Sequence, residues 1–339
     1  MTLLPSAFHF KTPSPSNSTS SSSSSASGSS LTPPPGTHLI ISDTPQASSD
    51  FVVYSLIASG IREKRPVTIV DFQARGRLHW ESVGKKIGTP FPPPSKTSTS
   101  TSSLVNYLAP GPQTLFDPET DEPSLTGLWE ELVGVGIEKT GSGSIPKNGD
   151  REDSKSKEEK DRSIARTGNQ RDGTTTISKN KDKEENRGGM GLEKGMILLV
   201  GFSELLYQGF SPEHLARFGR ALLGWCRQTQ TSLITTLHTP LLLNASSLGD
   251  HLSISPTLDP ESDLLLRLLR AGQDGGIWWR VEELKSGRSG VVHGEISVHP
   301  LSSRSSAIQQ RIPYTSPLQY RLDDNAVRVF PKGTGKGYL

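Results

Sequence analysis

The run Met196-Ile197-Leu198-Leu199-Val200-Gly201 decides the fold, and it follows directly after a long charged segment. A short apolar run rich in branched side chains is typical of a strand buried on both faces of a sheet, although a buried helix segment of this length can have the same composition. The shortness of the run and its terminal glycine favour the strand. Because a turn and an amphipathic helix follow, the region predicts one strand–helix repeat of an α/β sheet, whose ligands lie beyond the carboxyl ends of its strands.

Other stretches extend the same pattern along the chain. Apolar and β-branched runs at 38–42, 67–72, 104–108 and 232–238 predict further strands, and each is followed by apolar residues at helical spacing. Later runs are joined by turns and predict antiparallel strands, at 277–281, 290–298, 318–322 and 326–330. We therefore expect an α/β fold with a mainly parallel sheet that is extended by C-terminal antiparallel strands.

Composition divides the chain into one folded domain and several segments without a core. Residues 1–36 are rich in serine and proline, and residues 139–194 are charged with almost no apolar side chain. Neither segment can bury enough apolar surface to offset the entropy of ordering, so both are expected to be disordered. The domain then consists of two parts, 37–138 and 195–333, and residues 334–339 form a flexible tail.

A few apolar residues interrupt the N-terminal segment, namely Leu3, Leu4, Phe8 and Phe10. They could form a short edge element of the fold, or a motif that docks on a neighbouring protein. Composition favours the remaining alternative, an untethered terminus.

Charge and cysteine content restrict the compartment and the partners. The 339 residues carry a formal net charge of +2, so the chain lacks the overall positive charge of many nucleic-acid-binding proteins. The single cysteine, Cys226, excludes an intrachain disulfide and is expected to be a small buried side chain on a helix. With no visible secretory signal and no apolar run long enough for a membrane span, we expect a cytoplasmic protein without membrane contact, with the nucleus as a second compartment.

The order of the elements is that of a RecA-like (P-loop NTPase-like) core with three layers, but the residues that handle phosphate are missing. Such a core carries GxxxxGK[ST] after its first strand, where backbone N–H groups cradle phosphates. The corresponding loop, 43–50, has no glycine and no lysine, and Asp43 and Asp50 stand at its ends. The central strand ends in Gly201-Phe202 rather than in an acid that holds Mg²⁺. We therefore expect a degenerate phosphate loop, with no catalytic residue, no cofactor and no ATPase activity.

Other motifs fail on chemical grounds. The stretch 333–337 reads Gly-Thr-Gly-Lys-Gly, but neither Ser nor Thr follows Lys336, and too few residues remain to form a helix. The histidines are scattered without the spacing of zinc ligands, and no GxSxG or HExxH motif occurs. The acids at 117–122 lie in a stretch with proline, which favours a solvated loop over a metal site.

Two stretches resemble a known family, that of the sixth subunit of the Elongator complex. The run from His79 to Gly88, HWESVGKKIG, is similar to the family's H-Y-x-x-V-G-x-K-L-G helix. The run from Gln319 to Gly333, QYRLDDNAVRVFPKG, resembles the family's closing hairpin, Q-Y-K-x-x-D-x-x-V-x-F-x-x-K-G. The similarity extends over 37–333 apart from the insertion, and the insertion and the serine-rich N-terminus are the departures.

The resemblance implies a RecA-like subunit with no catalysis of its own. In the family, Elongator subunits four, five and six form a hetero-hexameric ring that binds tRNA and docks on the large catalytic subcomplex. That subcomplex starts the carboxymethyl-type modification of the wobble uridine of tRNA. The implied partners are therefore subunits four and five, the catalytic subcomplex, and tRNA through the assembled ring.

Two groups of residues are candidates for such contacts. Apolar side chains just beyond the central strand could meet a neighbouring subunit, with core packing as the alternative; these are Phe202, Leu206, Tyr207 and Phe210. Basic side chains after the second strand could contact RNA phosphates, with a solvated helix face as the alternative; these are Arg75, Arg77, Lys85 and Lys86.

Two other functions are compatible with the sequence. The chain could be a nucleotide hydrolase or recombinase that uses an unorthodox pocket with Asp43 or Asp50. It could also be a RecA-like adaptor in another assembly, such as a DNA-repair paralogue complex. ATP turnover by the chain alone favours the first, and the proteins that co-purify distinguish the second from an Elongator subunit.

Overall fold

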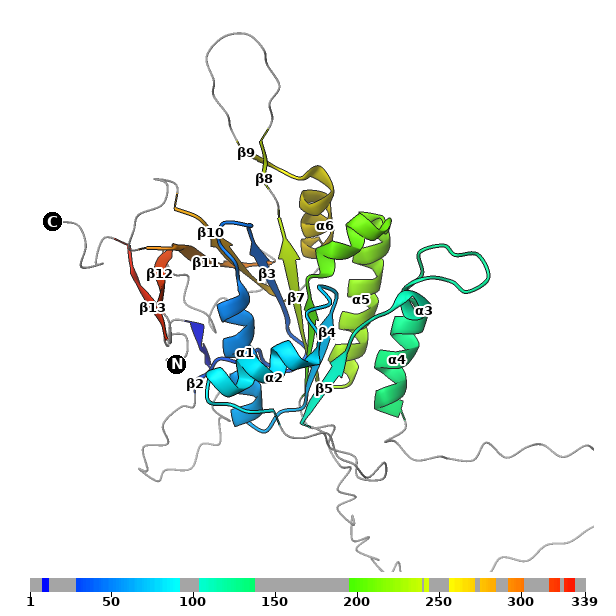
Figure 1. Ribbon diagram of the computed structural model, residues 1–339, viewed down its shortest axis with the longest axis horizontal. Coiled ribbons are helices and arrows are strands. Elements are labelled where there is room, and N and C mark those ends of the chain that lie inside the picture. Colours follow the sequence, from blue (N-terminus) through cyan, green and yellow to red (C-terminus); the bar gives the residue numbers. More distant parts are fainter. Residues whose placement is uncertain are drawn as a thin grey trace, which may run out of the picture.

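The structure is a computed structural model, and it describes residues 8–11, 29–91, 104–137, 195–239, 241–243, 256–271, 275–284, 292–301, 317–323 and 326–332. These residues form a mixed α/β structure around a nine-stranded sheet (Figure 1). The insertion predicted at 139–194, the tail predicted at 334–339 and the Gly-Lys-Gly stretch within 333–337 lie outside the described residues.

The larger part of the sheet is parallel. Its strands are β3 (His38–Asp43), β4 (Val67–Asp71), β5 (Val105–Leu108), β6 (Met196–Val200), β7 (Ser232–His238) and β10 (Ile277–Glu282). They neighbour one another in the order β10-β3-β7-β6-β4-β5, and every pair is parallel. The strand predicted in the central run is confirmed, because β6 lies between β7 and β4 and all of its residues are buried.

Beyond β10 the sheet continues with antiparallel strands, as predicted from the C-terminal turns. They are β11 (Gly294–Pro300), β12 (Leu318–Asp323) and β13 (Ala326–Pro331), in the order β10-β11-β12-β13. β10 joins the two parts, since it is parallel to β3 and antiparallel to β11. Its side chains alternate between the faces, so Trp279 is buried whereas Trp278 and Arg280 are half-buried on the opposite face.

Helices cover both faces of the parallel part (Figure 1). One face carries α1 (Asp50–Arg62) and α2 (Arg77–Lys86), and the other carries α4 (Thr126–Ile137), α5 (Pro212–Gln228) and α6 (Pro260–Arg270). The predicted cap of α5 is confirmed, because the backbone N–H of His214 donates to Ser211 Oγ over 3.2 Å. The sequence pattern does not predict two short helices, α3 (Pro112–Leu115) and the 3₁₀ helix η2 (Phe202–Gln208).

The central strand separates two apolar cores. Alternate side chains of a strand point to opposite faces of the sheet. Leu198 and Val200 belong to the core that contains α1, whereas Ile197 and Leu199 belong to the core that contains α5 and α6. A strand in this position has no solvent-facing side, which is the physical reason for its uninterrupted apolar sequence.

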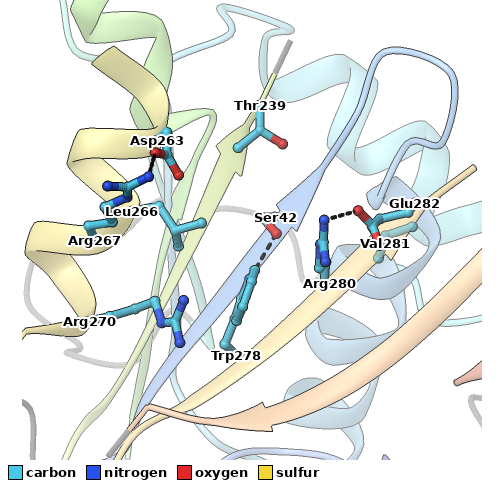
Figure 2. A pocket seen from close by; sticks show the side chains of 10 residues that line it. All are labelled: Ser42, Thr239, Asp263, Leu266, Arg267, Arg270, Trp278, Arg280, Val281 and Glu282. Carbon is cyan, nitrogen blue, oxygen red and sulfur yellow. Dashed lines mark hydrogen bonds and ion pairs between the residues drawn. The ribbon is translucent and has the colours of Figure 1, made fainter. Parts of the chain in front are cut away.

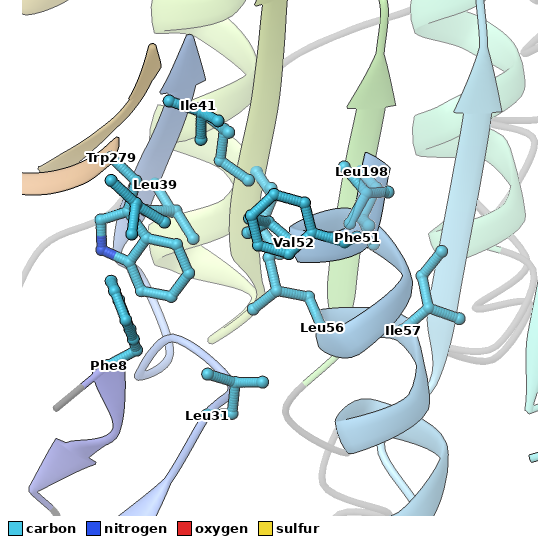
Figure 3. Close-up of a cluster of buried hydrophobic side chains, with 14 of the residues drawn as sticks. Phe8, Leu31, Leu39, Ile41, Phe51, Val52, Leu56, Ile57, Leu198 and Trp279 are labelled. Atoms are coloured by element: carbon cyan, nitrogen blue, oxygen red, sulfur yellow. The ribbon is translucent and has the colours of Figure 1, made fainter. Parts of the chain in front are cut away.

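The N-terminal segment contributes to the first of these cores, which corrects the expectation that 1–36 is disordered as a whole. Phe8 and Phe10 are each 2% exposed, and the ring of Phe8 meets Trp279 edge-on with centroids 5.3 Å apart (Figure 3). The short strands β1 (Phe10–Lys11) and β2 (Ser29–Ser30) pair antiparallel and bring Leu31 into the same core. Of the alternatives considered, a short edge element therefore describes Phe8 and Phe10.

Polar contacts fix the residues after β2 to the end of α1. The hydroxyl of Thr32 donates to the carboxylate of Glu63. The guanidinium of Arg65 donates to the carbonyl of Pro33 over 2.9 Å. The folded domain therefore begins before residue 37, the boundary that composition suggests.

A small hairpin-like pair follows β7 in the chain. β8 (Leu241–Leu243) pairs antiparallel with β9 (Pro256–Leu258), away from the main sheet (Figure 1).

Among the helices of the described residues, none is long and apolar enough to cross a membrane.

Replacing Phe8 with alanine should lower the free energy of unfolding by about 3 kcal/mol, because truncating a buried aromatic side chain leaves a cavity. Urea denaturation of the full-length chain, followed by tryptophan fluorescence, measures the loss. The matched control is Leu78→Ala, where the side chain is 80% exposed. For that variant a change below about 0.5 kcal/mol is expected. Equal unfolding midpoints for Phe8→Ala and the parent chain would contradict a packed N-terminal segment.

Candidate functional site

The topology of the sheet indicates the carboxyl ends of β3 and β7 as the place where a ligand would be expected. The chain leaves β3 through α1 toward β4 on one side, and it leaves β7 through α6 toward β10 on the other side. In open α/β sheets, ligands bind where neighbouring strands diverge in this way, beyond the carboxyl ends of the strands. The two residues at this point are Asp43 and His238, which are direct partners in the register of the strands.

Asp43 occupies the anion position at the start of α1. Its Oδ2 accepts from the backbone N–H of Ser49 over 2.7 Å and from the Ser49 hydroxyl over 2.8 Å. The N-terminus of a helix favours negative charge because its first N–H groups lack partners within the helix. In a nucleotide-binding core a phosphate takes that place. Here a carboxylate that is 1% exposed takes it, so a phosphate would meet both a filled position and a like charge.

His238 lies opposite Asp43, at the end of β7. Its Nδ1 pairs with Asp43 Oδ1, and its Nε2 contacts the side-chain amide of Gln73. Its backbone N–H donates to Ser203 Oγ over 2.8 Å, which ties the end of β7 to η2. The end of β3, the end of β7 and the loop after β4 are therefore joined through one imidazole ring.

The proton on His238 is held by its surroundings. Burial lowers the pKa of the ring, but the hydrogen bond and the negative charge of Asp43 outweigh burial, with smaller support from Glu204 and Asp50, so the pKa of His238 is raised above its ordinary value. In the protonated ring both nitrogens donate. A half-turn of the Gln73 amide would present its Oε1, a buried atom with no hydrogen-bond partner, as the acceptor for Nε2.

Gly201 leaves space for the side chain of Gln73 to reach His238. The glycine has a φ of +72°, and a Cβ built on it would lie 2.4 Å from Cγ of Gln73. Its N–H donates to Thr236 Oγ1 over 2.7 Å, which holds the end of β6 against β7. At the end of β6 the chain therefore has a backbone turn that admits the neutral amide of Gln73.

Both carboxylate oxygens of Asp71, at the end of β4, accept hydrogen bonds from neighbouring groups. Its Oδ2 accepts from the indole N–H of Trp80 over 3.0 Å and from the hydroxyl of Tyr107 over 3.1 Å. Its Oδ1 accepts from the backbone N–H of Gln73 over 3.1 Å. Burial, and then the charge of Asp71, raise the pKa of Tyr107 to about 12, so its hydroxyl stays a donor. Asp71 therefore fixes the loop between β4 and α2 and positions Gln73.

Three of the predicted interface residues are core residues, which corrects that part of the prediction. Phe202, Leu206 and Phe210 are 0%, 7% and 2% exposed and pack in the core beside α5. Only Tyr207 of the group is open to a partner, with 66% of its surface exposed. The sequence allowed both arrangements, because an apolar pattern does not show which side of a short helix faces the sheet.

The predicted RNA-contacting residues lie on or beside α2, but their charges are not equally free. Arg75 pairs with Asp50 over 2.8 Å, and Arg77 pairs with Glu81 over 2.7 Å. Lys85 and Lys86 are exposed in the last turn of α2. In the described part of the chain no ion pair joins either lysine, so they retain the positive charge that a phosphate would meet.

The described residues hold no group of three or more His, Cys, Asp or Glu side chains placed for a metal ion. Cys226 is buried as predicted, and burial raises the pKa of its thiol to about 12, so the reactive thiolate is suppressed at neutral pH.

A scan against protein-family models gives no match for this chain, and a search of the curated proteins gives none.

Substituting Gly201 with alanine should destabilise the chain by about 1–2 kcal/mol, because the left-handed conformation disfavours a Cβ. The added Cβ would also collide with Gln73. The matched control is Gly224→Ala in α5, where a Cβ meets nothing within 4 Å. In this exposed helical position alanine should instead stabilise by about 0.5–1 kcal/mol. Opposite shifts of the urea midpoint are expected, and a neutral Gly201→Ala would contradict the close approach of Gln73.

Because Asp43 raises the pKa of His238, we expect the free energy of unfolding to decline as the pH rises. A raised pKa in the folded state gives stabilisation that is complete below the unfolded value of about 6.5 and is lost as the pH rises through the folded value. In Asp43→Asn the largest of the effects that raise the pKa of the ring is removed and only the smaller ones from Glu204 and Asp50 oppose burial, so the pKa should fall and this decline should weaken. Proton NMR titration of the His238 ring and urea midpoints across this pH range test both effects. An unchanged His238 titration in the variant would contradict the role of Asp43.

Proposed function

We propose that this chain is a non-catalytic, RecA-like subunit of the Elongator complex, related to its sixth subunit. The single observation that carries the non-catalytic part is the carboxylate of Asp43 at the start of α1, where a nucleotide phosphate would otherwise bind. The resemblances at 79–88 and 319–333 carry the choice of family. The proposal places the chain in the cytoplasm, with the nucleus as a second compartment.

The strand order supports a RecA-like core that has lost its ligand. β3 and β6 are separated by one strand, β7, so the loops after β3 and β6 open at the same edge. A phosphate loop and a magnesium-holding acid need this arrangement in order to act on one nucleotide. Asp43, His238, Gln73 and Gly201 occupy that space with contacts among themselves. A closed edge of this kind serves assembly better than turnover.

The proposed assembly is the hetero-hexameric ring with subunits four and five, which docks on the large catalytic subcomplex and supports wobble-uridine modification of tRNA. Tyr207 is the residue of the predicted interface group that is available for a neighbouring subunit. Lys85 and Lys86 are the residues of the basic group with uncompensated charge, so they are the proposed contacts to tRNA phosphates.

Affinity purification of the full-length chain from its own cells tests the family assignment. The proposal requires the fourth and fifth Elongator subunits in the purified material, and reduced wobble-uridine modification in tRNA when the gene is deleted. Recovery of a DNA-repair paralogue complex, with unchanged tRNA modification, would replace the proposal with the adaptor alternative. ATP turnover by the purified chain that is lost in Asp43→Asn would establish the hydrolase alternative instead.

Within the assembled ring, the double variant Lys85→Gln and Lys86→Gln should weaken tRNA binding and reduce the slope of log affinity against log salt by about 1–2, as expected when up to two phosphate contacts are removed. Arg77→Gln should have a smaller effect, since Glu81 already compensates its charge. Lys64→Gln, at an exposed lysine after α1, is the control. Binding isotherms at several salt concentrations measure the slopes, and an unchanged slope in the double variant would exclude the two lysines.

A further inference from the structure

A pocket lies on the face of the sheet opposite α1. The inference drawn from this pocket is independent of the proposed function. It has a volume of about 290 Å³ and lies between α6 and the strands β3 and β10 (Figure 2). Its lining includes Ser42, Leu266, Arg270, Trp278 and Arg280. The sequence predicted the strand that carries Trp278 and Arg280, but it gave no sign that α6 would place Arg270 beside them.

Arg270 contacts an aromatic ring, and no ion pair joins it to any of the described residues. Its guanidinium carbon lies 4.5 Å from the centre of the Trp278 ring, in a cation–π contact. Its Nε is buried and has no hydrogen-bond partner. Among the described residues, no carboxylate lies within ion-pair distance of this guanidinium, and a buried donor without a partner is unfavourable unless a ligand completes it.

The other arginines of the pocket are paired. Arg267 meets Asp263 over 2.5 Å, and Arg280 meets Glu282. The pocket therefore has three guanidinium groups and two carboxylates, which leaves one net positive charge, and that charge belongs to Arg270.

The positive potential extends to a neighbouring histidine. The ring of His299 contacts that of Trp278 at a tilt of 38°, with ring centres 5.0 Å apart. Burial lowers the pKa of His299, and the charges of Arg280 and Arg270 lower it further. The positive charges of Arg270 and Arg280 therefore reach the space beside the Trp278 ring.

We propose that this pocket binds a single carboxylate carried on an apolar body, with the planar fork of Arg270 as its bidentate partner. Arginine matches a carboxylate through two parallel N–H···O bonds. Leu266 and the ring of Trp278 provide apolar surface for the body of the ligand (Figure 2). Ser42 accepts from the indole N–H of Trp278 over 2.8 Å, which leaves the hydroxyl proton of Ser42 to donate to the ligand.

The charges in the pocket favour a carboxylate over a phosphate. Asp263 and Glu282 line the same space, so a dianion would gain one unpaired positive charge and face two negative ones. A monoanion matches the single uncompensated charge. The carboxylate could come from an acidic side chain of a protein or from a small free acid, and both sources share this chemistry.

The test uses the full-length chain labelled with ¹⁵N, because the indole N–H of Trp278 is a probe inside the pocket. The probes are hexanoate, a blocked Leu-Glu-Leu peptide, the matched Leu-Gln-Leu peptide, and inorganic phosphate. The Trp278 signal should shift in a saturable way with hexanoate or the glutamate peptide, and with neither the glutamine peptide nor phosphate. The tighter of the two carboxylate probes identifies the source as a small acid or a protein.

Variants connect the binding to Arg270. Arg270→Gln should weaken binding by at least about tenfold, the expected loss of a charged bidentate contact. Arg270→Lys keeps the charge and loses the fork, so it should bind with intermediate affinity and also serves if the glutamine variant does not fold. Arg217→Gln removes a charge from an exposed position on α5 and should bind as the parent does. A Trp278 shift with phosphate alone, no shift with either carboxylate, or equal affinity in Arg270→Gln would overturn the proposal.

Discussion

The contact between Asp43 and His238 determines what the carboxyl edge of the sheet can do. The two residues end neighbouring parallel strands at the point where the chain diverges, which is the place where an α/β sheet normally opens to a ligand. Their pairing fills the anion position of α1 from within the chain. Because the carboxylate is buried and the pKa of the ring is raised, the contact forms an internal ion pair at this edge.

The same contact connects the sheet ends in series. His238 reaches Gln73, Gln73 crosses over Gly201, and the backbone of Gln73 is held by Asp71. Asp71 in turn holds Trp80 on α2, inside the stretch that resembles the Elongator family. A buried polar network is stabilising only when its members have partners, and most of these groups do. The carboxyl edge of the sheet at this point therefore contributes to the rigidity of the fold.

The residues that we propose for contacts with other molecules lie away from the pair of Asp43 and His238. Tyr207 and the lysines at the end of α2 lie on the surface, and Arg270 lies in a pocket under α6. Within the described residues, no ion pair joins the side chains of Arg270, Lys85 or Lys86, and Tyr207 is largely exposed. An interaction with another molecule is the physical means by which such groups gain partners.

The sequence by itself determined the strands of the main sheet, its parallel and antiparallel parts, and the absence of a lysine and a glycine-rich turn after β3. Local periodicity and composition carry that information, as the uninterrupted apolar run of β6 shows. Only the tertiary structure decided that Phe202, Leu206 and Phe210 are core, that Phe8 packs on Trp279, and that Arg270 stands over the ring of Trp278. Each of these depends on contacts between residues far apart in the chain, and a linear pattern records which side chains are apolar or charged but not which of them meet.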